Sequence, residues 1–146
     1  MQPNVPNVVP GKVVFTVDAR HADEEQLDRF CRWVMQEFAS LADERQLAIH
    51  GTEWFREEPV PMNGKLKGHL DDVCAKLAIS SKRMVSGAGH DAQMFGHLCP
   101  TAMLFVPSRC GISHSPEEYT APRDLAVGVL VLTELLYRLG YEGEEL

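Results

Sequence analysis

The chain has 146 residues, of which 45% are hydrophobic and 24% are charged, and its formal net charge is -7. This length supports one core or two smaller pieces of a larger protein, and the acidic balance excludes the basic face of a nucleic-acid-binding protein. No apolar run is long enough to span a bilayer, and residues 1–9 lack the pattern of a signal peptide.

In the first part of the chain, residues 13–19 alternate between two faces, which predicts a half-buried β-strand. Asp23 with Gln26 three residues later resembles a capping box and predicts a helix start. Residues 47–56 are rich in β-branched and aromatic types and predict a second strand. The prolines and the Asn-Gly pair of residues 57–64 predict a boundary. The apolar stripe expected on the helix is Leu27, Phe30, Cys31, Val34, Phe38 and Leu41.

Beyond this boundary, apolar residues at helical spacing from Leu66 to Leu77 predict an amphipathic helix, and residues 91–96 a short one. Residues 101–106 form a continuous apolar run, typical of a strand covered on both faces. Pro122 predicts the first turn of a last helix that ends near Gly140. The expected order is β-α-β, a linker, then α-loop-α-β-loop-α, which indicates two part-domains.

The cysteines have no C-x-x-C spacing, and we expect reduced thiols in a cytoplasmic protein rather than a zinc ribbon or a disulfide framework. They are Cys31, Cys74, Cys99 and Cys110. Residues 1–10 lead straight into a strand, as in the middle of a domain. We therefore expect the chain to be the C-terminal portion of a longer protein.

Two histidine-bearing loops flank the apolar run 101–106. In Gly87-Ala-Gly-His-Asp91, the glycines allow the backbone to approach a ligand, and His90 can donate to a substrate oxygen at a helix start. An ordinary turn before a helix is an equal alternative. His114, in Gly111-Ile-Ser-His-Ser-Pro-Glu-Glu118, is a candidate metal ligand, although one histidine cannot hold a metal alone. The alternative is a loop histidine hydrogen-bonded to Ser113 or Glu117.

A third candidate pair lies near the first predicted strand. Arg20 follows that strand on its polar face, and Asn7 precedes it. Together they can clamp a carboxylate, the arginine through two parallel bonds and the asparagine as a neutral donor. The alternative is an arginine that is solvated or paired with Asp18.

In combination, five segments resemble, in order, the hydantoinase/carbamoylase group of binuclear-metal amidohydrolases. This group includes N-carbamoyl-L-amino-acid hydrolases, allantoate amidohydrolases and β-alanine synthases. The resemblance covers nearly the whole chain. The segments are Asn7-Val-Val-Pro-Gly11, Phe15-Thr-Val-Asp-Ala-Arg20, Ser86-Gly-Ala-Gly-His-Asp-Ala92, Met103-Leu-Phe-Val-Pro-Ser108 and Gly111-Ile-Ser-His-Ser-Pro-Glu-Glu118.

The resemblance implies an α/β fold. Residues 1–60 would form the second half of an α+β lid domain that also makes a homodimer. Residues 61–146 would form the C-terminal part of a zinc-exopeptidase-like catalytic domain. The implied reaction is hydrolysis of the C–N bond of a small N-carbamoyl or ureido acid, such as an N-carbamoyl-L-amino acid or allantoate.

By resemblance, His114 matches the last ligand of a site for two divalent metal ions, zinc or manganese. Asn7 and Arg20 match the groups that hold the substrate carboxylate, and Gly89 and His90 match substrate contacts. The other ligands and the catalytic glutamate of the group have no counterpart in the chain, so we expect no catalytic residue here and an inactive isolated chain. A related metallopeptidase or aminoacylase, and a non-catalytic dimerisation module, are the alternatives.

Overall fold

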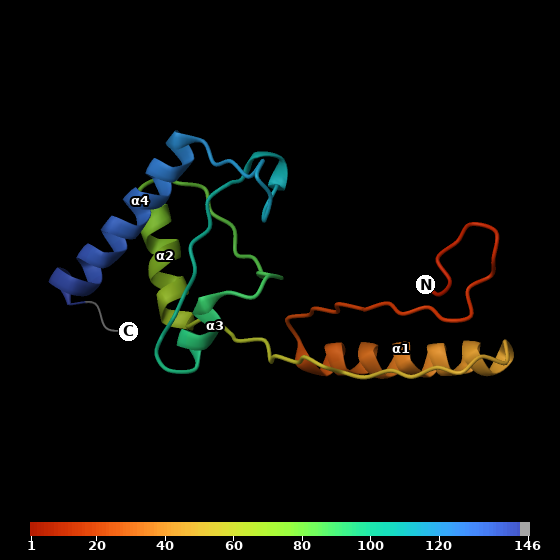
Figure 1. Cartoon of the computed structure of the whole chain (residues 1–146). Helices are drawn as coiled ribbons and strands as arrows, with labels where there is room; N and C mark the ends of the chain where they lie inside the picture. The colour runs from red at the N-terminus through yellow and green to blue at the C-terminus, as the bar shows by residue number, and fades with distance from the viewer. Residues whose placement is uncertain (144–146) are drawn as a thin grey trace. The chain divides into compact units, whose positions relative to one another are not determined.

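The computed structural model describes residues 1–143, which divide into two compact units, Met1–Glu58 and a second that begins at Pro59 (Figure 1). Each unit is described by itself. The division lies two residues before the expected boundary after residue 60, within the proline-containing segment 57–64. Which part of a larger enzyme each unit represents stays a prediction.

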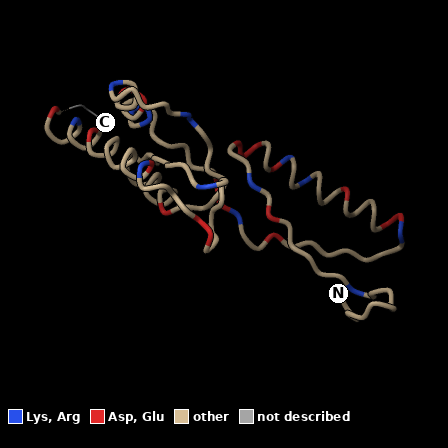
Figure 2. The backbone as a smooth tube through the Cα atoms, turned by 90° about the horizontal axis from the view of Figure 1, so that it is seen from above, with Lys and Arg blue, Asp and Glu red and all other residues tan. Residues whose placement is uncertain are grey.

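The first unit is built on one long helix, α1, over Glu24–Glu44. Asp23 caps it, because its carboxylate accepts the backbone N–H of Gln26 at 3.1 Å. The Gln26 side chain also donates to Asp23, at 3.3 Å, so the predicted helix start is confirmed. These two hydrogen bonds, the backbone one first, lower the pKa of the Asp23 carboxyl. Charges of both signs are interspersed along α1 (Figure 2).

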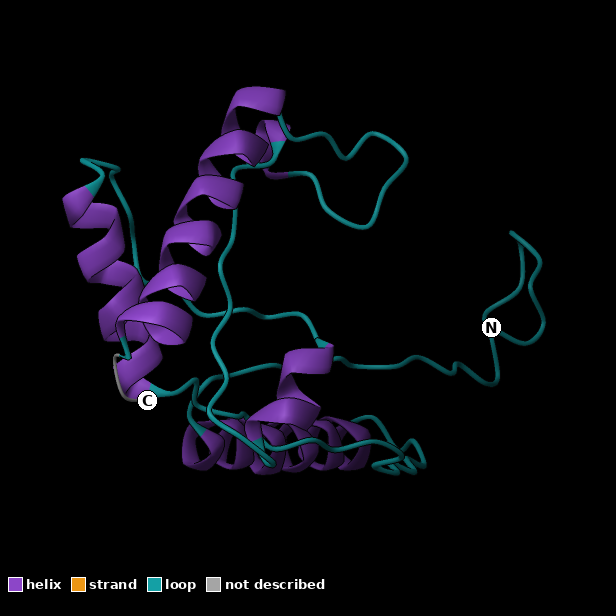
Figure 3. Ribbon diagram, turned by 90° about the vertical axis from the view of Figure 1, so that its left-hand side faces the viewer, coloured by secondary structure: helices purple, strands orange, loops and turns teal. Residues whose placement is uncertain are grey.

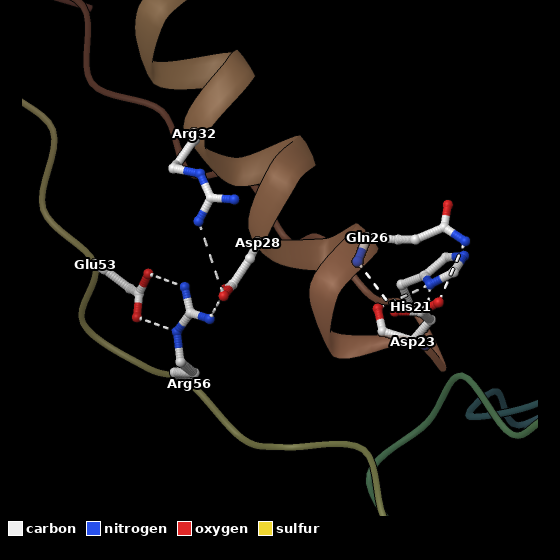
Figure 4. A network of polar contacts seen from close by, with 7 residues as sticks. All are labelled: His21, Asp23, Gln26, Asp28, Arg32, Glu53 and Arg56. Atoms are coloured by element: carbon white, nitrogen blue, oxygen red, sulfur yellow. Dashed lines mark hydrogen bonds and ion pairs between the residues drawn. The ribbon is translucent and has the colours of Figure 1, made fainter.

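Two extended segments of this unit contact α1. The rings of Phe15 and Phe38 meet edge to face with centroids 5.5 Å apart. In the second segment, Arg56 lies between Glu53, at 2.7 Å and 2.9 Å, and Asp28 of α1 (Figure 4). The hydrogen bonds to Glu53, then to Asp28, raise the pKa of Arg56. A ring contact and a charged cluster therefore tie the two segments to the helix.

The expected α/β class is not confirmed, because residues 1–143 contain no β-strand (Figure 3). The segments 13–19, 47–56 and 101–106, which we expected to be strands, form no ladder with one another. A strand exists only where its backbone groups pair with a neighbouring strand. Within the described part of the chain, the sole β-type pairing is an isolated antiparallel bridge between Gln2 and Lys12.

The core of the second unit lies between two helices, α2 over Gly64–Lys76 and α4 over Pro122–Tyr137. Both helices were predicted. Asn63 caps α2 by accepting the Leu66 N–H at 3.0 Å, and Pro122 stands in the first turn of α4. The buried core consists of Val73, Cys74, Val131 and Leu135, with Leu70, Leu77, Ile79 and Leu139 packed against it.

The segment 101–106 is placed by contacts at both of its ends. The Thr101 carbonyl accepts the N–H of Asn63 at 2.8 Å. At the other end, Val106 lies close to Gly128 of α4. A Cβ added at Gly128 would stand 2.6 Å from a methyl group of Val106. The last residue of the apolar run therefore meets α4 at a glycine, and this contact lies just before the loop that carries His114.

The remaining helices are short. α3, over Asp91–Gly96, confirms the predicted short helix, and η1 is a single 3₁₀ turn over Arg109–Gly111. After α4, the chain continues as a π-helical turn, η2, over Arg138–Glu142, past the end expected near Gly140. In residues 1–143, no helix combines the length and the apolar character that a membrane crossing requires.

Candidate functional site

The loop that carries His114 is closed at its base by Arg109 and Tyr119. The backbone N–H of Arg109 donates to the Tyr119 carbonyl at 2.8 Å, and the Arg109 guanidinium lies 5.1 Å from the centre of the Tyr119 ring. Inside the loop, the Ser108 hydroxyl donates to the carbonyl of Ile112 at 2.5 Å. The loop is thus organised by its own hydrogen bonds.

His114 has a left-handed backbone, with φ 55. This region disfavours a residue that carries a Cβ, so such a residue is held there by its surroundings. Its backbone N–H donates to Glu118 Oε2 at 3.0 Å. Its side chain is exposed. The ring makes no hydrogen bond with any described residue, so the alternative of a ring bonded to Ser113 or Glu117 is wrong for residues 1–143.

His90 stands at the N-terminus of α3, where its Nδ1 accepts the N–H of Ala92 at 3.2 Å. A nitrogen that accepts a hydrogen bond carries no proton, so the neutral ring holds its proton on Nε2. The Nε2–H group is the donor that this ring can offer. The sequence-based role for His90, donation to a substrate oxygen, therefore matches the tautomer that the helix start selects.

The loop before α3 contains two glycines, Gly87 and Gly89, and its backbone conformation does not require either of them. Neither Gly87 nor Gly89 has a positive φ. A Cβ added at Gly87 would meet nothing within 4 Å, and one added at Gly89 would meet only Gln93, at 3.9 Å. Neither the backbone conformation nor the local packing therefore requires a glycine at these two positions.

Arg20 is bound to Asp18 in the first unit. Its Nε donates at 2.9 Å and its terminal nitrogen at 2.6 Å, which is the two-pronged geometry of an arginine on a carboxylate. The hydrogen bond raises the pKa of Arg20 and lowers that of Asp18. Asn7 is exposed in a turn, and no contact among residues 1–143 joins it to Arg20. The predicted pairing with Asp18 is therefore present.

The described residues do not by themselves fit a two-metal site. No group of three or more His, Cys, Asp or Glu side chains in residues 1–143 converges where it could hold a metal ion. His114 is the single ligand that the sequence predicts, and a catalytic zinc ion in proteins is held by three protein ligands. No metal-dependent step can therefore be derived from this chain alone.

Within the second unit, no described contact joins His114 to the loop of Gly89 and His90. Sequence reasoning missed the roles of Arg109, Tyr119 and Glu118. The role of Glu118 could have been predicted from its spacing in the sequence, because a carboxylate four residues after a loop residue can reach the backbone N–H of that residue. The pairing of Arg109 with Tyr119 could not have been predicted from the sequence, because it depends on how the loop closes.

Residues 1–138 match the sequence family described as Peptidase family M20/M25/M40. The chain belongs to this family. Amidohydrolases of the M20 family are metal-dependent, and the chain's relatives are hydrolases, so the chain is part of a hydrolase family. Cys31, Cys74, Cys99 and Cys110 are free thiols in this structure.

Three curated relatives of this M20 chain are amidohydrolases. The allantoate amidohydrolase of Bacillus subtilis (strain 168) is 45% identical over 140 residues, 96% of this chain and 34% of the relative. That of Escherichia coli (strain K12) is 44% identical over 141 residues, 97% of this chain and 34% of the relative. An N-carbamoyl-L-amino acid amidohydrolase of Geobacillus stearothermophilus is 31% identical over 138 residues, 94% and 34% respectively.

These matches confirm the resemblance to the hydantoinase/carbamoylase group. A crystal structure from Burkholderia cenocepacia, described as an amidohydrolase/peptidase, superposes with a TM-score of 0.72 at 34% identity. It covers 80% of this chain and 28% of that one. The M20 chain spans about a third of the length of the curated relatives that it matches.

Proposed function

We propose that this M20 chain forms part of an amidohydrolase that cleaves the C–N bond of a small ureido or N-carbamoyl acid. The supporting observation is the 45% and 44% identity to two allantoate amidohydrolases over nearly the whole chain. The carbamoyl-amino-acid relative is 31% identical. Allantoate is therefore the first substrate to test, and N-carbamoyl-L-amino acids are the second.

In this proposal, His114 is a metal ligand. Its ring has no partner among residues 1–143, so both nitrogens are available, and neutral imidazole is a common ligand. His114 also has φ 55, a conformation that a residue other than glycine keeps only where its surroundings hold it. The further ligands of two divalent ions, zinc or manganese, and the catalytic acid-base group would come from residues outside this chain.

The Gly-rich loop would orient the substrate. His90 offers Nε2–H because α3 engages its Nδ1, and an N–H donor suits a ureido carbonyl oxygen. Gly89 would leave its backbone open to close approach, which agrees with the finding that an added Cβ would meet only Gln93, at 3.9 Å. Both groups would bind and position the substrate without moving a proton.

The carboxylate of the substrate would bind to Arg20 and Asn7. Within this chain, Asp18 is bound to the Arg20 fork at 2.6 Å and 2.9 Å. The substrate carboxylate would therefore exchange with Asp18, as one planar anion for another of the same geometry. Asn7 would add a neutral donor from its exposed turn.

The setting of the enzyme is part of the same proposal. Four free thiols fit a reducing compartment, and we assign the protein to the cytoplasm. Residues 1–60 would belong to a lid domain that pairs two subunits into a homodimer, and residues 61–146 to the catalytic domain. On α1, Phe30 and Trp33 are exposed aromatic side chains. They support the proposal that a second subunit covers this face of the first unit.

A chimera tests the proposal. The third of the Bacillus subtilis allantoate amidohydrolase that aligns with this chain is replaced by the chain, and hydrolysis of allantoate and N-carbamoyl-L-amino acids is measured. We expect activity, and we expect His114→Ala to reduce it by about a hundredfold or more, beyond the loss typical of a group that only supports a ligand. His97→Ala, an exposed histidine of the same unit, serves as the matched control.

The second candidate function is hydrolysis of a peptide bond, because the family description names peptidases. The same chimera is assayed with dipeptides and N-acyl amino acids. Faster turnover of dipeptides than of ureido acids would favour this candidate. A folded chimera that cleaves none of these substrates would contradict both enzymatic functions and favour a dimerisation module.

A further inference from the structure

The loop between Arg109 and Tyr119 carries one bond that bears directly on His114. The carboxylate of Glu118 accepts the backbone N–H of His114 at 3.0 Å. An N–H donor on a carboxylate is a charge-assisted hydrogen bond, and such bonds are stronger than neutral ones. Through this bond, Glu118 restrains the residue whose ring is the predicted ligand.

The restraint acts on a backbone that would otherwise leave its conformation. His114 has φ 55, where its Cβ crowds the chain, and glycine or asparagine is the usual occupant. The bond from His114 N–H to Glu118 is present in this conformation and stabilises the loop in it. Since φ and ψ direct the Cα–Cβ bond, the conformation also sets where the imidazole points.

The acceptor itself is held in place. Glu118 donates its N–H to the Ser115 carbonyl at 3.0 Å, and the next residue, Tyr119, is fixed by Arg109 through a backbone bond of 2.8 Å and a ring contact. The neighbouring Glu117 donates its N–H to Ser115 Oγ at 3.2 Å. The carboxylate that meets His114 therefore projects from a braced segment.

From this geometry we infer that Glu118 is a positioning residue for His114, which it holds in the left-handed conformation that aims the ring. The inference rests on the proposed function of His114. Among residues 1–143, the hydrogen bond that the Glu118 carboxylate makes is to the backbone N–H of His114, so we assign it a role through the histidine and not on the substrate. Arg109 and Tyr119 contribute by closing the loop that presents Glu118.

The first test measures amide hydrogen exchange at His114 in this chain. Glu118→Ala removes the acceptor, and we expect the exchange rate of His114 to rise by roughly three- to tenfold. Glu118→Gln keeps an acceptor oxygen and should retain most of the protection. Glu117→Ala, the matched change one residue away, should leave the rate unchanged. If Glu118→Ala fails to fold, Glu118→Asp withdraws the carboxylate while keeping its charge and should also speed exchange.

The second test uses the chimera with allantoate as substrate. We expect Glu118→Ala to lower kcat by about tenfold with little change in KM, and Glu118→Gln to restore most of the rate. A purely structural role would reduce the folded fraction without this split and without rescue. Unchanged exchange at His114, or unchanged kcat per folded enzyme, in Glu118→Ala overturns the inference. Full activity of His114→Ala instead overturns the proposed function, so the two failures are distinct.

Discussion

Lys76, the last residue of α2, donates to Glu134 Oε1 of α4 at 2.6 Å. Arg138 donates to the same oxygen at 3.3 Å. The carboxylate therefore joins the two helices that enclose the core of the second unit. Glu134 comes one residue before the buried Leu135, so its polar contacts lie at the edge of that core.

The contacts of Glu134 with Lys76 and Arg138 predict that the stability of the second unit depends on pH. The hydrogen bond from Lys76, followed by that from Arg138, lowers the pKa of Glu134 below its ordinary 4.5. A carboxyl with a lowered folded pKa stabilises the fold above the ordinary pKa, and this stabilisation disappears as the pH falls through the folded pKa. We expect Glu134→Gln to lower Tm at pH 7 and to change it little at pH 2.

Thermal unfolding followed by circular dichroism at both pH values measures this difference. Glu117→Gln, an exposed carboxylate of the same unit, is the control and should show no such pH dependence. An equal effect of Glu134→Gln at neutral and acid pH would contradict the prediction.

The core predicts a contrast between two valines. Val73 is 0% exposed in the contact of α2 with α4, whereas Val129 of α4 is 64% exposed. Val73→Ala should destabilise the second unit by about 2 kcal/mol through lost burial and the cavity left behind. Val129→Ala should change its stability by less than about 0.5 kcal/mol. Urea denaturation measures the free energy of unfolding of both variants. Equal losses of stability would contradict the assignment of Val73 to the core.

Gly128 predicts coupling between α4 and the segment 101–106. A methyl group at Gly128 would stand 2.6 Å from a Val106 methyl, so Gly128→Ala should destabilise by about 1 kcal/mol or more through overpacking. In the background Val106→Ala, the same change should be neutral or stabilising, because alanine is the better helix former. A double-mutant cycle in urea measures the coupling. Gly140→Ala, where a Cβ meets nothing within 4 Å, is the control.

Arg20 predicts a binding effect in the chimera. Both Arg20→Ala and Arg20→Lys should raise KM for allantoate about ten- to a hundredfold, because lysine cannot reproduce the two-pronged contact seen with Asp18. Arg32→Ala, an exposed arginine of α1, should leave KM unchanged. Rescue by lysine would show that charge alone suffices, against the proposed carboxylate clamp.

The helices could be predicted because their signals are local. Asp23 and Asn63 act as caps through bonds to residues three positions later, and Pro122 stands at a helix start by its own geometry. The face that α4 buries could not be predicted. Apolar residues follow one another along most of the helix, from Leu125 to Leu132, and only its packing against α2 selects Val131 and Leu135 while Val129 stays exposed.

The sequence by itself determined where the helices begin, which loops carry His90 and His114, and which family the motifs resemble. Each of these depends on residues close together in the chain. The tertiary structure decided that the extended segments remain unpaired in residues 1–143, that Arg109 meets Tyr119 to close the loop of His114, and that α4 buries Val131 and Leu135 against α2. Strand pairing and loop closure depend on contacts whose partners the chain brings together only when it folds.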